Sequence, residues 1–236
     1  MAALIATSAP ARAQSLRDFT TPQPLPQDAC LVVGFEGGVE HWNDARRPVR
    51  RLALDLRARA LPNVFVETAE HRKRKRVLEL VRRALDRNRD GVLDAGERAS
   101  ACVVLYGHSL GGMAVLKLSR ELQTLGLPVR LAIEVDSIGK GRRVVPANVA
   151  RVANFYQRSG PLLRGHSDLA LEDPEATRVL ANEKLDYSER AVDLSRVNPL
   201  ERAAGGTHTK MEFDPELWSR VEGLVVEEIQ RARSRN

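Results

Sequence analysis

The segment from Gly107 to Gly111, GHSLG, places a serine between two glycines, after an apolar run and before a segment with helical periodicity. A serine hydroxyl becomes a nucleophile when a base takes its proton and fixed donors stabilise the resulting oxyanion. The G-x-S-x-G pattern is informative in this strand-to-helix context, because the two glycines let strand and helix pack closely around a sharp turn. We therefore predict Ser109 as the nucleophile, and the Leu110 N–H, at the start of the helix, as an oxyanion donor.

The longer segment YGHSLGG, residues 106–112, resembles the nucleophile elbow of lipases and esterases of the α/β-hydrolase superfamily. The resemblance covers most of the chain, from about Cys30 to Ile229. It implies the chain order nucleophile, acid, histidine, and a Ser-His-Asp triad that cleaves a small-molecule acyl ester without an organic cofactor.

The order implied by this resemblance selects among the five histidines. His41 and His71 precede the serine, and the side chain of His108, inside the turn, should point away from the serine hydroxyl. His208 lies just before the last predicted helix, in a loop where the superfamily carries its catalytic histidine. We predict His208 as the base, with His166 as the alternative.

The acid should follow a strand that comes after the serine. Asp136 ends the apolar run LAIEV, and active sites collect at the carboxyl ends of parallel strands. We predict that it orients His208, with Asp168, beyond a later strand, as the alternative. A second oxyanion donor is expected after the first strand, from the N–H of Phe35 or Glu36, although Glu36 departs from the apolar residue usual there.

Residues 86–97, DRNRDGVLDAGE, match the calcium-binding loop of an EF-hand. The predicted calcium ligands are Asp86, Asn88, Asp90, the carbonyl of Val92, Asp94 through a water, and a bidentate Glu97. The exit helix is short and no second loop follows, which favours a structural ion over a sensor. The arrangement resembles bacterial α/β-hydrolases with a DxNxDGxL insert before YGHS. A strand of about seven residues, roughly 23 Å long, should separate the calcium from the serine.

These candidates depend on short apolar runs that alternate with amphipathic helices, a pattern typical of a parallel sheet covered on both faces. We predict strands near 30–35, 64–68, 101–107, 129–135 and 150–157, and helices near 47–60, 72–85, 110–123 and from Asp214-Pro215 onward. The polar segment 159–206 is interpreted as loop with a short helix. The predicted fold is a minimal α/β-hydrolase fold, a three-layer α/β sandwich with a mostly parallel sheet of about five to six strands, in one domain over 28–236.

Composition excludes several other classes of protein. A hydrophobic fraction of 43% over 236 residues indicates a globular chain, and no apolar run approaches the ~18 residues of a transmembrane helix. The net charge of +6 is spread among 31 acidic residues and aromatic residues make up only 4%, so we expect no nucleic-acid partner. The densest basic run, Arg72–Arg76, is interpreted as a solvated helix start, with contact to an anionic membrane or substrate as the alternative.

The first 27 residues are interpreted as a leader and an extended lead-in. The stretch ALIATSAPARA ends in a small-x-small pattern like the end of a secretory signal, so we expect a secreted or periplasmic protein, with a cytoplasmic one as the alternative. Cys30 and Cys102 are expected to be buried thiols, with one disulfide as the alternative.

Two other functions compete with ester hydrolysis. The first is a non-catalytic α/β-hydrolase-like domain that binds a ligand, which would follow if neither His208 nor His166 reached Ser109. The second is a calcium-responsive interaction protein, which would change conformation when the 86–97 loop binds the ion.

Overall fold

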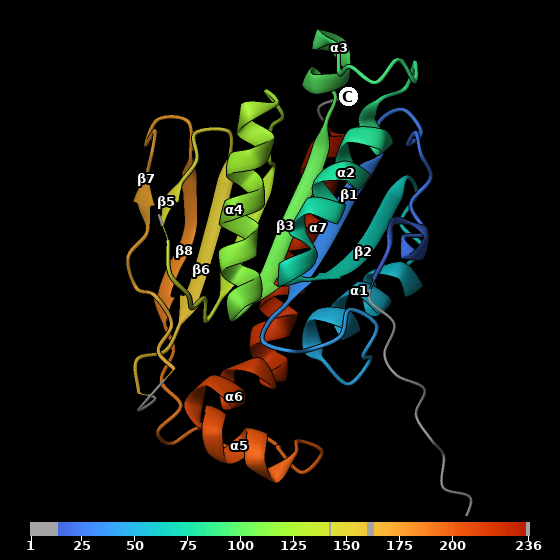
Figure 1. Cartoon of the computed structure of the whole chain (residues 1–236). Coiled ribbons are helices and arrows are strands. Elements are labelled where there is room, and N and C mark those ends of the chain that lie inside the picture. Colours follow the sequence, from blue (N-terminus) through green and yellow to red (C-terminus); the bar gives the residue numbers. More distant parts are fainter. Residues whose placement is uncertain (1–13, 142, 160–162, 235–236) are drawn as a thin grey trace, which may run out of the picture.

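The computed structural model describes residues 14–234, except 142 and 160–162. Its centre is a six-stranded, fully parallel sheet in the order β2-β1-β3-β4-β6-β8 (Figure 1). The strands are β1 (Cys30–Glu36), β2 (Val64–Glu70), β3 (Cys102–His108), β4 (Leu131–Val135), β6 (Arg151–Tyr156) and β8 (Arg178–Lys184). Two short strands, β5 (Val144–Val145) and β7 (Ala170–Leu171), pair beside it. The predicted α/β fold with a mostly parallel sheet is confirmed.

Four helices cover the two faces of the sheet. α1 (Pro48–Ala58) and α7 (Pro215–Arg233) pack on one face, and α2 (Arg74–Leu85) and α4 (Leu110–Thr124) pack on the other. Pro48 and Pro215 occupy the first turns of α1 and α7. The Asp214 side chain accepts the Glu216 N–H as the N-cap of α7, as the sequence predicts. Shorter elements are α3 (Ala95–Ala99), α5 (Pro199–Gly205), α6 (Thr207–Glu212) and the 3₁₀ turns η1 (Leu16–Asp18) and η2 (His71–Lys73).

The central strands β1, β3 and β4 are buried on both faces, so their apolar side chains pack in two cores. In β3, Val103 and Leu105 pack with α2 and α4, whereas Val104 and Tyr106 pack with α1 and α7. This division follows from the period of two along a strand. A continuous apolar run is therefore required for a central strand, and β1 and β3 both have one.

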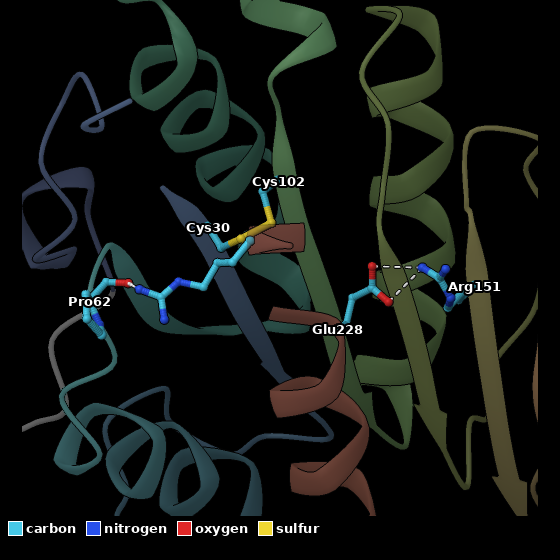
Figure 2. The surroundings of a disulfide bond; sticks show 6 residues. Cys30, Pro62, Cys102, Arg151 and Glu228 are labelled. Atoms are coloured by element: carbon cyan, nitrogen blue, oxygen red, sulfur yellow. Dashed lines mark hydrogen bonds and ion pairs between the residues drawn. A yellow bond between two sulfur atoms is a disulfide. The ribbon is translucent and has the colours of Figure 1, made fainter. Parts of the chain in front are cut away.

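The two cysteines form a disulfide, which corrects the expectation of buried thiols. Cys30 and Cys102 are the first residues of β1 and β3 and are partners in the parallel register, with Cα atoms 4.6 Å apart (Figure 2). Neighbouring strands that start at the same level bring their first side chains within bonding distance. Close by, the Arg151 guanidinium pairs with Glu228 at 2.8 Å, joining β6 to α7 (Figure 2).

One strand of the sheet was not predicted. β8 lies in the segment interpreted as loop, and it adds to the edge of the sheet beside β6. Its sequence, RVLANEK, lacks a continuous apolar run because an edge strand is partly exposed, and Val179 is one of its exposed residues. The same segment contains α5, consistent with the predicted short helix.

Residues 14–27 lie against the domain. Phe19 and Leu25 are buried in the core that α2 and α4 share, and the Gln14 amide donates to the Thr68 carbonyl at 2.8 Å. The predicted export signal falls mostly on residues 1–13, which lie outside the described residues. Among the described residues, no helix has the length and apolar character needed to span a membrane.

Candidate active site

Ser109 lies in a strained turn between β3 and α4. Its backbone has φ 59° and ψ −124°, a region that residues with a side chain rarely adopt. Strand and helix approach closely at the flanking glycines. A Cβ on Gly107 would lie 2.5 Å from the Gly111 carbonyl carbon, and one on Gly111 would lie 2.1 Å from the Phe35 oxygen. Both glycines are therefore required by close approach, as the turn chemistry predicted.

Three side chains that are far apart in the sequence form one hydrogen-bonded chain. The Ser109 hydroxyl lies 2.9 Å from His208 Nε2, and His208 Nδ1 lies 2.6 Å from Asp136 Oδ2. All three side chains are buried. A carboxylate oxygen only accepts, so Nδ1 carries the hydrogen and Nε2 is left to accept the serine O–H. The structure thus brings together the three residues that the sequence singled out.

The Asp136 carboxylate is held by a second set of donors. Oδ1 accepts the backbone N–H of Gln157 at 3.1 Å, and Oδ2 accepts the Gln157 side-chain amide at 2.9 Å. Gly165 packs directly against it, since a Cβ there would lie 2.0 Å from Asp136 Oδ1. These contacts set the orientation of the carboxylate toward His208.

The two alternatives from the sequence do not join this chain. The His166 ring contacts the Gly139 carbonyl at 3.0 Å through Nε2 and makes no hydrogen bond to Ser109. Asp168 is not a hydrogen-bond partner of His208 among the described residues. Burial raises the pKa of Glu134, and the nearby charge of Asp168 raises it further. The residues that contact one another and Ser109 are therefore the preferred candidates, Asp136 and His208, and not Asp168 and His166.

His208 is in the first turn of α6, a helix where the sequence predicted a loop. An ion-pair cluster ties this segment to the start of α1. The Arg47 guanidinium donates to Glu201 of α5 through Nη2 at 3.0 Å and to Glu212 of α6 through Nη1 at 3.0 Å. Arg47 thus joins both short helices to the segment that follows β1, and so positions the turn that carries His208.

His108 stacks on His208. The ring centroids are 4.7 Å apart with an interplanar angle of 30°, so its side chain lies beside the triad. Burial lowers the pKa of His108 well below its ordinary value, and the nearby His208 and Arg47 lower it further. A neutral ring packed on this face limits the orientations open to His208. The sequence analysis excluded His108 as the base and did not predict its contact with His208.

Three glutamates lie behind the histidine: Glu36, Glu40 and Glu212. Burial raises the pKa of each, most strongly for Glu36, which also feels the charges of Glu40 and Glu212. Arg47 opposes all three elevations. One guanidinium thus faces several buried carboxyl groups, and their burial favours the neutral form of each. No local pattern in the sequence predicts this glutamate cluster, because its members come from β1, the loop that follows it and α6.

The predicted oxyanion donors belong to two segments that meet at the Ser109 turn, the start of α4 and the end of β1. Leu110 is the first residue of α4, where backbone N–H groups have no partner within the helix. The loop after β1 passes close by, since a Cβ on Gly37 would lie 2.8 Å from Ser109 Cβ. Phe35 and Glu36 are the last two residues of β1 and lead into this loop. The Glu36 side chain is buried, and its Oε1 has no hydrogen-bond partner among the described residues.

The 86–97 loop lies at the other end of the sheet from α6, beside α3 (Figure 1). Its oxygen donors suit calcium in kind, but their present partners are backbone N–H groups. Asp86 accepts from Asp90 at 3.1 Å and Gly91 at 3.0 Å, and Glu97 accepts from Arg87 at 2.7 Å. Within the described residues, no three His, Cys, Asp or Glu side chains converge as a metal site. The donor set fits the ion in kind, and binding would require the carboxylates to exchange these N–H partners for it.

Comparison with known proteins adds little to this geometry. No protein-family profile and no curated protein matches the chain. Among solved structures, the RedJ thioesterase from the prodiginine biosynthetic pathway in Streptomyces coelicolor is similar, with 11% identity, a TM-score of 0.45, and coverage of 96% of this chain and 100% of that one. A cutinase-like protein from Cryptococcus sp. has 11% identity, a TM-score of 0.41, and coverage of 85% and 95%. Similarities this distant carry no argument about function.

Proposed function

We propose that the chain is a serine hydrolase that cleaves a small-molecule acyl ester. The observation that supports this most is the buried hydrogen-bonded chain from Ser109 through His208 to Asp136. It combines a nucleophile in a strained turn, a base in the required tautomer and an acid that orients the base. A ligand-binding domain without catalysis has no need of this arrangement.

The chemistry follows from the direction of the hydrogen bonds. His208 Nε2 takes the serine proton as Ser109 Oγ forms a bond to the acyl carbon, and the carbonyl oxygen becomes an oxyanion. The N–H of Leu110 and an N–H from Phe35 or Glu36 stabilise that oxygen. The ester C–O bond then breaks, and His208 returns its proton to the departing alkoxide.

The acyl-enzyme is resolved by reversal of these roles. A water gives a proton to His208 Nε2 and adds to the acyl carbon, after which the bond to Ser109 Oγ breaks and the serine regains a proton. Asp136 keeps its hydrogen bond to Nδ1 throughout and stabilises the imidazolium that forms in each half-reaction.

Labelling with a fluorophosphonate probe tests this proposal. Wild type should be labelled covalently, and Ser109→Ala should not. Ser119→Ala is the matched control, because Ser119 is a buried serine within α4 whose hydroxyl donates to the Val115 carbonyl of its own helix. A folded wild-type protein that is not labelled would contradict the proposal and favour the non-catalytic binding domain.

We also propose that the 86–97 loop binds a structural calcium ion. Asp86, Asn88, Asp90, Glu97, the Val92 carbonyl and, through a water, Asp94 would hold it. Glu97 would first have to release the N–H groups of Arg87, Asn88 and Asp94. The ion would neutralise carboxylates and strengthen the connection from α2 to β3. A calcium-responsive interaction protein would instead change shape when the ion binds.

Export to an oxidising compartment is the location we propose. The Cys30–Cys102 disulfide supports it, because such bonds persist in secreted and periplasmic proteins and are reduced in most cytosols. Mass spectrometry after thiol alkylation of the protein purified from its native cells tests this. Two alkylated cysteines would contradict it.

A further inference from the structure

A small hollow opens beside the turn that carries Ser109. It has a volume of about 160 Å³, and α4, η2, the start of α2 and the loop after β4 surround it. Its apolar part comes from Leu110 and Met113, and its cationic part from Arg72, Arg74, Lys117 and Lys140. Two of these cations belong to the basic run that the sequence analysis left as a solvated helix start or an anion-binding patch.

Two walls of the hollow are formed by neighbours of the Ser109 turn. Leu110, which lines it, is the residue after the nucleophile, and a Cβ on Gly139 would lie 3.2 Å from Leu110 Cδ2. His71, on another wall, lies against the backbone of Glu36 and Gly37, the loop that contacts Ser109. A group bound in the hollow would therefore sit close to an acyl carbon attached to the serine.

The charge of the hollow is one-sided. No Asp or Glu is among the described residues that line it. Arg72 pairs with Glu70 at 3.0 Å and Arg74 pairs with Glu121 at 2.8 Å. Neither glutamate lines the hollow. Lys117 and Lys140 are exposed and have no hydrogen-bond or ion-pair partner within the described part of the chain. Two positive charges therefore remain for a ligand.

The size of the hollow limits what it can hold. Pockets for whole small-molecule ligands measure about 300–1,000 Å³, so this hollow accommodates one substituent of a substrate. Its cations point to an anionic substituent, and its floor of Leu110 and Met113 suits a short apolar link to the reacting carbonyl.

We propose that the hollow selects acyl esters that carry an anionic group, a carboxylate or a phosphate, near the scissile carbonyl. The proposal rests on the proposed hydrolase function, and it assigns Lys117 and Lys140 as the residues that determine specificity. An anionic membrane surface is the other ligand that such charges could attract. The position beside Leu110, the residue that follows the proposed nucleophile, favours a substrate group.

The test compares two p-nitrophenyl esters of similar length, the neutral butyrate and the anionic mono-glutarate. Wild type should show a kcat/KM about tenfold higher on the anionic ester. Lys117→Gln and Lys140→Gln should each lower kcat/KM on the anionic ester up to about fivefold, the upper range for an exposed ion pair, and leave the neutral ester unchanged. Lys75→Gln is the matched control, because Lys75 is an exposed lysine of the nearby basic run Arg72–Arg76 and does not line the hollow. Equal preference for the two esters, or loss on both, would overturn the proposal.

A second measurement does not depend on catalysis. Reductive methylation with a carbon-13 label keeps the lysine charge, and NMR signals of Lys117 and Lys140 should shift on titration with glutarate or inorganic phosphate, while that of Lys75 should not. If the fluorophosphonate probe fails to label Ser109 but these signals shift, the hydrolase function falls and the anion site stands. No shift at either lysine would overturn the anion site. Sedimentation with phosphatidylglycerol vesicles, without ester preference, would assign the charges to a lipid surface instead.

Discussion

Replacing Gly165 by alanine would test how closely the acid of the proposed triad is held. The added Cβ would lie 2.0 Å from Asp136 Oδ1 and 3.0 Å from both Asp136 Cγ and Tyr156 Cβ. Cβ atoms essentially never approach another heavy atom within 3.0 Å, so the carboxylate and the loop must separate by about 1 Å. Because Asp136 Oδ2 is 2.6 Å from His208 Nδ1, this displacement acts directly on the hydrogen bond that orients the base.

The magnitude follows from two limits. Overpacking a buried position costs about 1–3 kcal/mol of stability, which leaves a folded protein of ordinary stability still folded. A misplacement of about 1 Å costs a reaction about 100-fold, and loss of the orienting acid costs about 10⁴-fold. We therefore expect Gly165→Ala to lower kcat by 100-fold to 10⁴-fold on any ester that wild type cleaves, with a smaller change in KM.

The assay measures kcat and KM on a p-nitrophenyl ester together with the Tm. Gly223→Ala is the matched control, because a Cβ on Gly223 in α7 meets nothing within 4 Å. That variant should retain wild-type activity and gain about 0.5–1 kcal/mol of stability from its better helix propensity. A Gly165→Ala enzyme that stays folded and lies within threefold of wild-type kcat would refute the reasoning.

Three further predictions concern the surroundings of the triad and the distant loop. Arg47→Met should cost about 1–3 kcal/mol and most of the activity, because it removes the hydrogen bonds that join α5 and α6 to the segment after β1 and so position His208. Arg46→Met, which removes a neighbouring arginine that is 84% exposed, should cost less than about 1 kcal/mol in the same urea titration and ester assay. Because folding lowers the pKa of His108, the imidazole binds a proton in the unfolded chain at pH values where it stays neutral in the folded chain. Stability should therefore fall as pH drops below about 6.5, by up to about 1.4 kcal/mol per pH unit, and a His108→Phe variant should show a shallower fall of Tm with pH; equal slopes would contradict this. Millimolar calcium should raise the Tm of wild type and not that of Asp90→Ala, whose exposed side chain bonds to Asn88 and Val92 of the same loop. Fluorophosphonate labelling should persist in chelator at low temperature. An unchanged wild-type Tm would exclude the calcium site.

Local rules were sufficient for the turn and for most of the sheet. The β1 and β3 runs are continuously apolar because both their faces are buried, and the glycines around Ser109 are required by the turn itself. Such features act over a few residues, so they can be recognised in a sequence. β8 escaped prediction because an edge strand has water on part of its surface and needs no apolar pattern.

The sequence by itself determined the candidates Ser109 and Asp136, which follow predicted strands, and His208, which the chain order implied by the resemblance selects before the last helix. Only the tertiary structure decided between Asp136 and Asp168, because that choice depends on which carboxylate lies within hydrogen-bond distance of a ring 72 residues further along the chain. The disulfide, the stacking of His108 on His208 and the basic hollow beside Leu110 were likewise decided by the packing of separate elements. The physical reason is that these contacts depend on the register of neighbouring strands and the docking of helices, whose free energies are summed over the whole core and are not encoded in any short segment.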